Sequence, residues 1–499
     1  MVLLSQITGL SPIIVLIVGI LAVFIQDLSR ENNRANRLYA IASLLASMLL
    51  SLYLSQMGDA TTFGGGSFAF NTYTYFYGTV FSLSALLVVL ASNRFLSSLE
   101  SPFEFNVLVL VATLGMFLVA ASTNLVSLFV AFEMATVATY GMTAYAKDKK
   151  TSAEAAIKFF VVGAVSAGII LYSISLIYMA TGTIAITSFF TVAQGSTRLL
   201  SVAFILLIAG FGFKIAAVPF HMWLPDTYDG APYPTTTYLA SASKIMGFAA
   251  LTKIFLVMGP AVEAQTALNW QIAFGVLSLL TMTLGNLAAL VQTDIKRMLA
   301  YSSISQSGYI IMGLALGSAF SYTIILYFVL VYAISKIGSF IVAEFFDAQY
   351  GARSISDYSW LAKKSPFSAF SLTIFFLSLA GIPPLAVFVA KFFMFYAAVQ
   401  VGGLWIGLAV AGVLNSALSL YYYARVIKNM YLGVEGVPQA AQFKITENKN
   451  YAIPVLIALA LTVALGLAEG PIIQLARYAV ASVSFLGMVH LIEALISTL

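Results

Sequence analysis

The chain of 499 residues is 61% hydrophobic and only 9% charged, a composition that excludes a soluble domain and is typical of a polytopic membrane protein. The net charge of +5 rests on so few charged residues that it does not indicate a nucleic-acid partner, and we expect none. Cysteine is absent and only His221 and His490 are histidines. We therefore expect no disulfide, no thiolate or multi-histidine metal site and no cofactor bound by this chain.

The sequence predicts an all-α fold of about fourteen membrane-spanning helices, because no ten-residue alternation typical of barrel strands is present. The first apolar run lacks a basic flank in front of it and is read as a retained span rather than a signal peptide. In chain order the spans are 11–26, 36–57, 73–92, 104–122, 124–145, 155–181, 199–222, 233–258, 267–291, 297–316, 320–345, 366–398, 404–431 and 451–468. A further apolar stretch, 471–498, is either a fifteenth span or an interfacial helix.

Basic residues in the loops are concentrated on one side of the predicted membrane. The loops after odd-numbered spans hold Arg30, Arg34, Arg37, Arg94, Lys147, Lys149, Lys150, Lys296, Arg297, Arg353, Lys363, Lys364, Lys428, Lys444 and Lys449, whereas the other loops hold Arg198. Since basic loops stay inside, this predicts an outside N-terminus.

A second set of basic residues falls within or beside apolar segments: Lys158, Lys214, Lys244, Lys253, Lys336, Lys391, Arg425 and Arg477. Lys253 and Arg425 lie near span ends, and we expect them to extend to the interface. Glu133 is the only carboxylate deep inside a predicted span. His221, beside Pro219, has either a capping role or a place in a proton entry path.

Three roles compete for these buried amines. A desolvated lysine loses much of its preference for the charged form and can load and release a proton. The charges could instead form a static ion-pair network, or bind an anionic solute at broken helices. Because the amines outnumber the single carboxylate, the pattern favours titrating groups.

An internal repeat pairs the fourth to eighth spans with the ninth to thirteenth. We expect the first repeat at 104–258 and the second at 267–431, after three helices in 1–103 and before a C-terminal segment at 451–499. Five helices are an odd number, so the two units have opposite orientation. The sixth and eleventh spans carry Lys158 and Lys336. The seventh and twelfth spans are predicted to be broken, with Lys214 beside Pro219 and Lys391 beside Gly381-Ile382-Pro383-Pro384.

Three blocks carry a family resemblance: FGFKIAAVPFHMWLPDTYDGAPYPTTTYLASASKIMGFAALTKIF (211–255), QTDIKRMLAYSSISQSGYIIMG (292–313) and SLAGIPPLAVFVAKFFMF (378–395). In this order they resemble the antiporter-like subunits of respiratory complex I. The GAP-x-P block followed by A-S-K is most similar to subunit N, or subunit 2, of NADH-quinone oxidoreductase.

The resemblance implies a proton-translocating subunit that performs no redox chemistry itself. The quinone, and NADH or another donor, would be used by the whole complex, whose other membrane subunits and the lipid bilayer would be the partners. It also implies a multi-pass location in the cell membrane of a prokaryote.

By the same resemblance the proton relay comprises Glu133, Lys214, Lys244 and Lys391, with Lys336, Lys158 and His221 as less diagnostic members. Three positions depart from the expected pattern: Gln306 stands where many relatives have histidine, and Val387 and Ala390 replace glycines.

Two alternatives remain open. One is a subunit of a multisubunit Na+/H+ antiporter, which has no redox partner. The other is a purely structural membrane subunit in which the lysines are idle. The electron donor, the quinone type, the host and the number of protons moved do not follow from this sequence.

Overall fold

A computed structural model of the chain describes residues 2–30, 33–58, 60–97, 102–146, 148–186, 197–265, 269–433 and 448–497. Lys147 and Lys444, counted above among the loop residues, lie outside these ranges. Twelve helices in the described part are long and apolar enough to cross a membrane. They are α1 (Val2–Arg30), α2 (Asn33–Met57), α3 (Thr72–Ala91), α5 (Pro102–Ala121), α6 (Leu125–Thr143), α7 (Lys150–Thr181), α9 (Thr197–Ile215), the run from Tyr233 to Val257, α14 (Trp270–Leu290), α16 (Ala319–Tyr350), α20 (Leu404–Leu432) and α21 (Lys449–Leu467).

The other two predicted spans are also helical. One is α15 (Ile295–Leu316), and the other is split into α18 (Pro366–Ala380) and α19 (Ala386–Val401). All fourteen predicted spans thus correspond to helices, and the all-α prediction is confirmed. The run from Tyr233 to Val257 consists of α11 (Tyr233–Tyr238), a π-helical segment η1 (Leu239–Ser243) and α12 (Lys244–Val257).

Short elements and a last helix complete the described chain. The undecided stretch after the fourteenth span forms one helix, α22 (Gly470–Ser497), packed against α3, α12 and α16. An antiparallel hairpin of β1 (Thr61–Phe63) and β2 (Phe68–Phe70) was not expected. The short helices are α4 (Asn93–Leu96), α10 (Trp223–Gly230), α13 (Gly259–Gln265), η2 (Ile355–Tyr358) and α17 (Leu361–Lys364).

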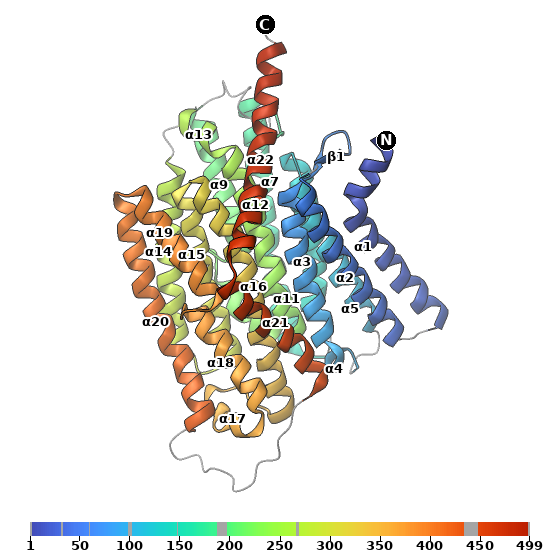
Figure 1. Cartoon of the computed structure of the whole chain (residues 1–499), viewed down its shortest axis with the longest axis vertical. Coiled ribbons are helices and arrows are strands. Elements are labelled where there is room, and N and C mark those ends of the chain that lie inside the picture. Colours follow the sequence, from blue (N-terminus) through green and yellow to red (C-terminus); the bar gives the residue numbers. More distant parts are fainter. Residues whose placement is uncertain are drawn as a thin grey trace.

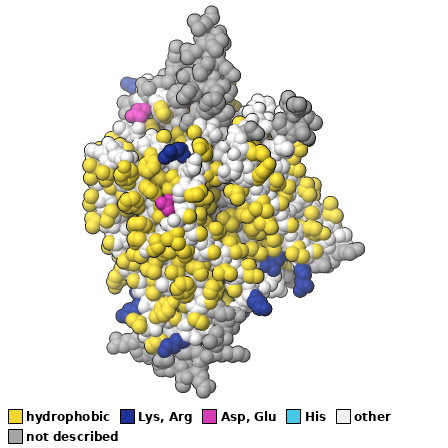
Figure 2. Space-filling model, in the orientation of Figure 1, with side chains coloured by type: hydrophobic (Ala, Val, Ile, Leu, Met, Phe, Trp, Pro, Cys, Tyr) yellow, Lys and Arg dark blue, Asp and Glu magenta, His cyan; other side chains and the backbone are white. Residues whose placement is uncertain are grey.

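Most helices run along the long axis of the molecule, with the N-terminus and β1 at one end and α4 and α17 at the other (Figure 1). The visible lysines and arginines gather mostly at the α4 and α17 end, below a broad band of hydrophobic side chains (Figure 2). We call this end the basic face; it includes Arg94, Lys149, Lys296, Arg353 and Lys363. Helix α16 lies inside the bundle, in contact with α3, α11, α12, α15, α18, α19, α21 and α22.

Two isolated β-bridges show the repeat in the backbone. Before α6, Leu125 donates its N–H to Ile184 (2.9 Å) and Ile186 donates to Thr123 (2.9 Å). Before α15, Ile295 donates to Arg353 (3.0 Å) and Ile355 donates to Thr293 (2.7 Å). In each repeat the bridge joins the start of the second helix to the residues after the third. The second bridge lies at the basic face and the first does not, as inverted repeats require.

The seventh and twelfth spans break in the same way. Helix α9 ends before Ala216, which has φ 54°, and α18 ends before Gly381, which has φ 92°. Pro219 and Pro384 each follow three positions later. The expectation of two broken helices is therefore confirmed, since the chain leaves the helix through the same left-handed backbone conformation twice.

The repeat does not align the amines residue by residue, although it aligns their helices. Lys214 lies two positions before its break, whereas Lys391 lies ten positions after its own. Counted from the breaks, Leu379 of the second repeat corresponds to Lys214, and Asp226 of the first repeat corresponds to Lys391. Lys158 and Lys336 also occupy different positions in their helices. Lys158 lies 24 positions before the left-handed C-cap Gly182, and Lys336 lies 15 positions before the left-handed C-cap Gly351.

Close backbone packing fixes the twelfth-span break in place. A Cβ on Gly466 of α21 would lie 2.2 Å from the Pro384 carbonyl oxygen and 2.7 Å from the Ala386 nitrogen. Helices α14 and α15 meet similarly, since a Cβ on Gly308 would lie 2.4 Å from the Met282 nitrogen. Small residues at such crossings let helices approach closely in a membrane.

The variant Gly466→Ala is expected to destabilise the protein by about 1–3 kcal/mol, because backbone atoms around Pro384 cannot move aside cheaply. The midpoint of thermal unfolding in detergent measures this. Gly407→Ala, also inside a helix but with nothing within 4 Å of its Cβ position, is the matched control and should unfold no earlier than the parent. Equal midpoints for both variants would contradict the packing argument.

Candidate functional site

Four of the predicted amines lie buried inside the bundle. Lys214, Lys244, Lys336 and Lys391 are each at most 2% exposed. Among the described residues no carboxylate oxygen forms an ion pair with any of them. A buried cation without a partner costs several kcal/mol, so the neutral groups that surround each amine determine what it can do.

Lys214, in the last turn of α9, lies in an aromatic pocket. Its Nζ donates to the Thr136 hydroxyl of α6 at 3.1 Å and lies 5.5 and 5.6 Å from the ring centroids of Phe132 and Phe159. Trp223 stacks on Phe159 with centroids 4.6 Å apart and donates to the Phe213 carbonyl at 3.0 Å. The amine thus has one hydroxyl partner and otherwise faces rings.

Lys244 and Lys336 both reach α15. The Lys244 Nζ, directly after the π-helical segment, donates to the Ser303 carbonyl at 2.9 Å. The Lys336 Nζ donates to the Leu299 carbonyl at 3.0 Å and to the Ser302 hydroxyl, which also accepts from Tyr423 at 2.8 Å. Leu299 and Ser303 are one turn apart on α15, so this turn receives two amines from different helices.

Lys391 folds back over the break in its own span. Its Nζ donates to the carbonyls of Leu379 (2.9 Å) and Ala380 (3.3 Å) at the end of α18, and lies 4.3 Å from the Tyr309 ring centroid. The Gln306 amide of α15 donates to the same Leu379 oxygen at 2.9 Å. Gln306, noted in the sequence only as a departure from the expected histidine, therefore connects α15 to the break.

Helix α15 is the shared scaffold of this site, which sequence reasoning did not predict. Over three consecutive turns of α15, Leu299 and Ser302 accept from Lys336, Ser303 accepts from Lys244, and the Tyr309 ring faces Lys391. Gln306, on the same helix, shares the Leu379 carbonyl with Lys391. Ser303 follows the N-cap Asp294 by nine positions, as Glu133 follows the N-cap Asn124 of α6. A serine carbonyl in the second repeat thus stands where the first repeat has a carboxylate.

Glu133 is half-buried on α6 and forms no ion pair with Lys214 among the described residues. His221 is half-buried in the segment between α9 and α10, and in the described part of the chain no hydrogen bond joins it to Lys214. The structure therefore brings neither residue into direct contact with that amine.

Lys158 lies apart from the buried amines. It is exposed on α7 and pairs with Glu154 (2.8 Å) and with Asp226 (2.9 Å), which also pairs with Arg297 (3.0 Å). The hydrogen bonds from Lys158 and Arg297 hold the pKa of Asp226 below its usual range. A carboxyl group with a depressed pKa stabilises the folded protein at pH values above the pKa of the unfolded state, and this stabilisation is lost as the pH falls through the pKa of the folded state. Because the Asp226 side chain is 39% exposed, its contribution to stability is below about 1 kcal/mol.

The expectation that Lys253 extends to the interface is wrong. It is 6% exposed and donates to the carbonyls of Ala120 and Ser122, at the end of α5. Arg425, which is half-buried, similarly donates to the Leu290 and Gln292 carbonyls at the end of α14. Both residues satisfy helix carbonyls that have no partner within their own helix.

A second buried carboxylate is Glu344 of α16, which the sequence places at a span end. It is 6% exposed and lies six residues before the end of the observed helix. The predicted span ended at residue 345, whereas α16 continues to Tyr350. The apolar run ends before the helix does, so the sequence pattern alone does not show that Glu344 lies within α16.

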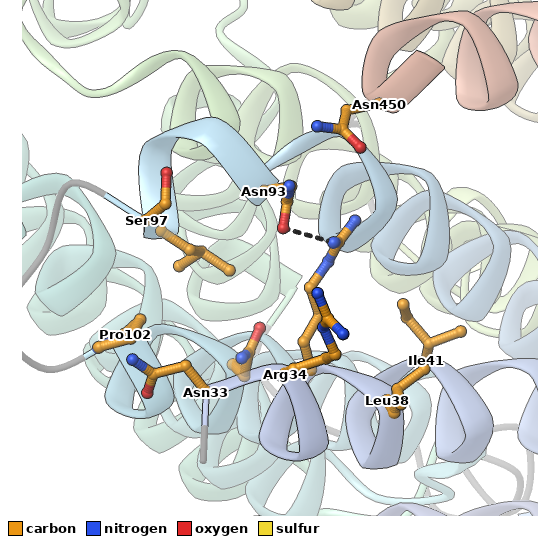
Figure 3. Close-up of a pocket in the computed structure, with 11 residues that line it drawn as sticks. Asn33, Arg34, Leu38, Ile41, Asn93, Ser97, Pro102 and Asn450 are labelled. Carbon is orange, nitrogen blue, oxygen red and sulfur yellow. Dashed lines mark hydrogen bonds between the residues drawn. The ribbon is translucent and has the colours of Figure 1, made fainter. Parts of the chain in front are cut away.

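Two sizeable cavities of the described structure are not lined by the four buried amines. One of about 520 Å³ is lined by residues of α2, α4, α5 and α21, with Arg37 donating to Asn93 at 2.6 Å (Figure 3). None of the predicted relay residues lines it. A second cavity, of about 320 Å³, opens at the basic face beside Lys296 and Glu344.

Comparisons with known proteins agree with one another. The family model described as NADH:quinone oxidoreductase/Mrp antiporter, TM, matches residues 122–419. F(420)H(2) dehydrogenase subunit N of Methanosarcina mazei is 37% identical in an alignment of 497 positions that covers 95% of this chain and 98% of that protein. NADH-quinone oxidoreductase subunit N of Desulfitobacterium hafniense is 38% identical in an alignment of 467 positions that covers 88% of this chain and 91% of that protein.

Solved structures share the fold. A chain of respiratory complex I from Thermus thermophilus with bound aureothin has a TM-score of 0.78 and 29% identity, covering 93% of this chain and 99% of that one. A chain of the Mrp complex from Dietzia sp. has a TM-score of 0.86 at 22% identity, covering 96% and 98%. At that identity the second likeness shows the fold alone.

The variant Ser302→Ala is expected to destabilise the protein by about 1–3 kcal/mol, because Lys336 and Tyr423 both lose a buried hydroxyl partner. Ser307→Ala on the same helix removes only a bond to the Ser303 carbonyl, and should cost less than about 1 kcal/mol. Thermal unfolding in detergent compares the two. An equal shift for both variants would show that Ser302 does not hold the amine.

Proposed function

The chain belongs to the subunit N family of NADH-quinone oxidoreductases, and we propose that it translocates protons along the row of buried amines Lys214, Lys244, Lys336 and Lys391. It is a membrane subunit of a complex I-type quinone oxidoreductase. The observation that carries the relay proposal is that these amines, with no carboxylate paired to them, all bind neutral acceptors inside the bundle.

The neutral acceptors around the amines favour a role in proton transfer over a role as permanently charged groups. An ammonium paired to a carboxylate is held in one protonation state, whereas an amine facing carbonyls and hydroxyls has little to fix its charge. A static ion-pair network would need acids next to the amines, and the described residues provide none. This supports the titrating role over the structural one.

In the proposed relay a proton passes from Lys214 to Lys244, Lys336 and Lys391. The turn of α15 at Leu299–Ser303 joins the middle pair, and Gln306 links that turn to the Lys391 break. Steps that no direct hydrogen bond spans need water next to the breaks, where free carbonyls can bind it. Lys391 is the last amine of the proposed relay and delivers the proton to the outer side of the membrane.

Glu133 acts on this relay through its charge rather than by contact. A carboxylate on α6 near Lys214 favours the protonated amine, and its neutralisation favours release. Lys158 and Asp226 lie at the surface end of the same repeat, where His221 and the broken segment offer an approach for protons. We assign these three residues supporting roles at the entry.

The redox steps belong to other subunits of the complex in this proposal. This chain supplies no thiolate, since it has no cysteine, and we assign it no cofactor. The relatives named for NADH and for F(420)H(2) make either compound a candidate donor for the whole complex. The quinone would be bound and reduced elsewhere, and coupling would reach this chain through neighbouring membrane subunits.

The Na+/H+ antiporter alternative rests on fold likeness at 22% identity. The similarity to subunit N proteins covers about nine-tenths of the chain at 37–38% identity, and this favours the oxidoreductase.

Replacing Lys214 by Ala or Glu133 by Gln in the assembled complex is expected to lower quinone-coupled proton uptake at least tenfold for Lys214 and several-fold for Glu133. Inverted membrane vesicles with a pH-sensitive dye measure the uptake. Assembly should be unaffected, as judged by native gel. Lys428→Ala, at an exposed lysine of α20, is the control. Normal pumping by both relay variants would sink the proposal, and loss of assembly would support a scaffold.

The basic face is proposed to lie inside a prokaryotic cell, with the N-terminus outside. The absence of cysteine makes this testable with single cysteines. In inverted vesicles an impermeant thiol reagent should label Ser356→Cys, exposed at the basic face, and should spare Thr62→Cys in β1. The opposite pattern would reverse the topology.

A further inference from the structure

The cavity at the basic face is lined by charged residues from five parts of the chain. Its volume is about 320 Å³, enough for several waters. The titratable groups that line it are Arg94, Lys149, Asp229, Tyr233, Lys296, Glu344, Asp347, Arg353 and Tyr451. No residue of the proposed relay is among them.

Glu344 lines the deep part of this cavity. Its side chain is 6% exposed and its Oε2 atom is buried without a hydrogen-bond partner among the described residues. The hydroxyls of Tyr233 and Tyr451, which also line the cavity, are likewise buried without a partner. Buried polar atoms are nearly always hydrogen-bonded, so three such atoms around one polar cavity indicate bound water.

Two of the four cations that line the cavity, Lys296 and Arg353, have partners other than Glu344. The Lys296 Nζ donates to the carbonyls of Asp229 (3.1 Å) and Ala231 (2.8 Å) and lies 4.3 Å from the Tyr233 ring centroid. Arg353 pairs with Asp347 at 3.3 Å. Glu344 forms no ion pair in the described structure and is therefore not fixed as one half of a salt bridge.

Glu344 and Lys336 lie on one face of α16. They are eight residues apart, with Phe340 midway, and residues four apart share a helix face. The Phe340 ring centroid lies 6.0 Å from the Lys336 Nζ and 6.0 Å from the Tyr228 ring. Phe340 thus lies on the same helix face, midway along the helix between a carboxylate of the cavity and a buried relay amine.

We propose that Glu344 is a proton-loading carboxylate, and that this cavity is a second inlet from the basic face that feeds Lys336 directly. A hydronium ion in the cavity gives its proton to Glu344, leaving water and a neutral carboxyl. When Phe340 moves aside and water enters, the carboxyl gives that proton to the neutral Lys336 amine, which becomes ammonium, and the carboxylate is restored. The inlet loads Lys336 without passing through Lys214. Each turnover needs both loadings, so that loss of either one lowers pumping, and the inlet rests on the proposed relay role of Lys336.

Access of water is tested without reference to activity. In the assembled complex in inverted vesicles, a water-soluble methanethiosulfonate should label Ala348→Cys at the cavity lining, and Glu344→Cys more slowly. Labelling is read on this chain by mass. Ala343→Cys, buried on α16 away from the cavity, should stay unlabelled. If Glu344→Cys stayed unlabelled while Ala348→Cys was complete, the inlet would be excluded.

Proton loading is tested by Glu344→Gln, which keeps the shape and removes the titrating group. Quinone-coupled proton uptake in inverted vesicles should fall about threefold to tenfold, and Glu344→Asp should restore at least half of it. Glu263→Gln, an exposed carboxylate far from the basic face, is the control and should pump like the parent. Uptake equal to the parent in Glu344→Gln would overturn the proposal.

A merely structural role of Glu344 predicts a different result. It would make the Gln and Asp variants equally defective at every pH, whereas proton loading makes the Gln defect largest at high pH on the basic face, where hydronium is scarce. Normal pumping by Glu344→Gln together with a defective Lys214→Ala would refute the inlet alone. Normal pumping by Lys214→Ala and by Lys336→Ala would refute the relay itself.

Discussion

The structure depends on how it accommodates cations inside an apolar bundle. Several basic side chains bind the last carbonyls of a helix: Lys253 at α5, Arg425 at α14, Lys296 at α10 and Arg37 at α3. These carbonyls have no partner within their own helix, and the helix dipole makes them favourable for a positive charge. Such cations stabilise helix ends and need not titrate. Lys214, Lys244 and Lys336 bind no helix end, and this difference separates them from the caps.

Lys391 belongs to both groups. It binds the final carbonyls of α18, as a cap does, but this helix end lies inside the bundle because the span is broken there. The break thus brings a C-terminal carbonyl pair to a depth where a continuous helix would offer none. Gly466 seats α21 against the same break, so packing of a distant helix fixes the geometry around the amine.

The two repeats share a backbone and differ in chemistry. The bridges before α6 and α15 and the breaks after α9 and α18 correspond position by position. The residues that carry charge do not: Glu133 corresponds to Ser303, Lys214 to Leu379 and Lys391 to Asp226. The duplicated scaffold therefore holds buried amines at positions that differ between the repeats, rather than two copies of one site. Helix α15 contributes three of the neutral acceptors of these amines, the Leu299 and Ser303 carbonyls and the Ser302 hydroxyl, although none of the four amines lies on it.

The sequence by itself determined the all-α membrane fold, the fourteen helical segments, the two broken spans and the buried positions of Lys214, Lys244, Lys336 and Lys391. These follow from local causes, since apolar length sets the spans and a proline after a left-handed residue ends a helix. Only the tertiary structure decided what each amine contacts. It placed Lys158 at the surface, turned Lys253 into a helix cap, and drew three amines to α15. It also extended α16 past its apolar run and so buried Glu344. Contacts between side chains and backbone groups of different helices depend on how the helices pack, and no local pattern of apolar and charged residues encodes that.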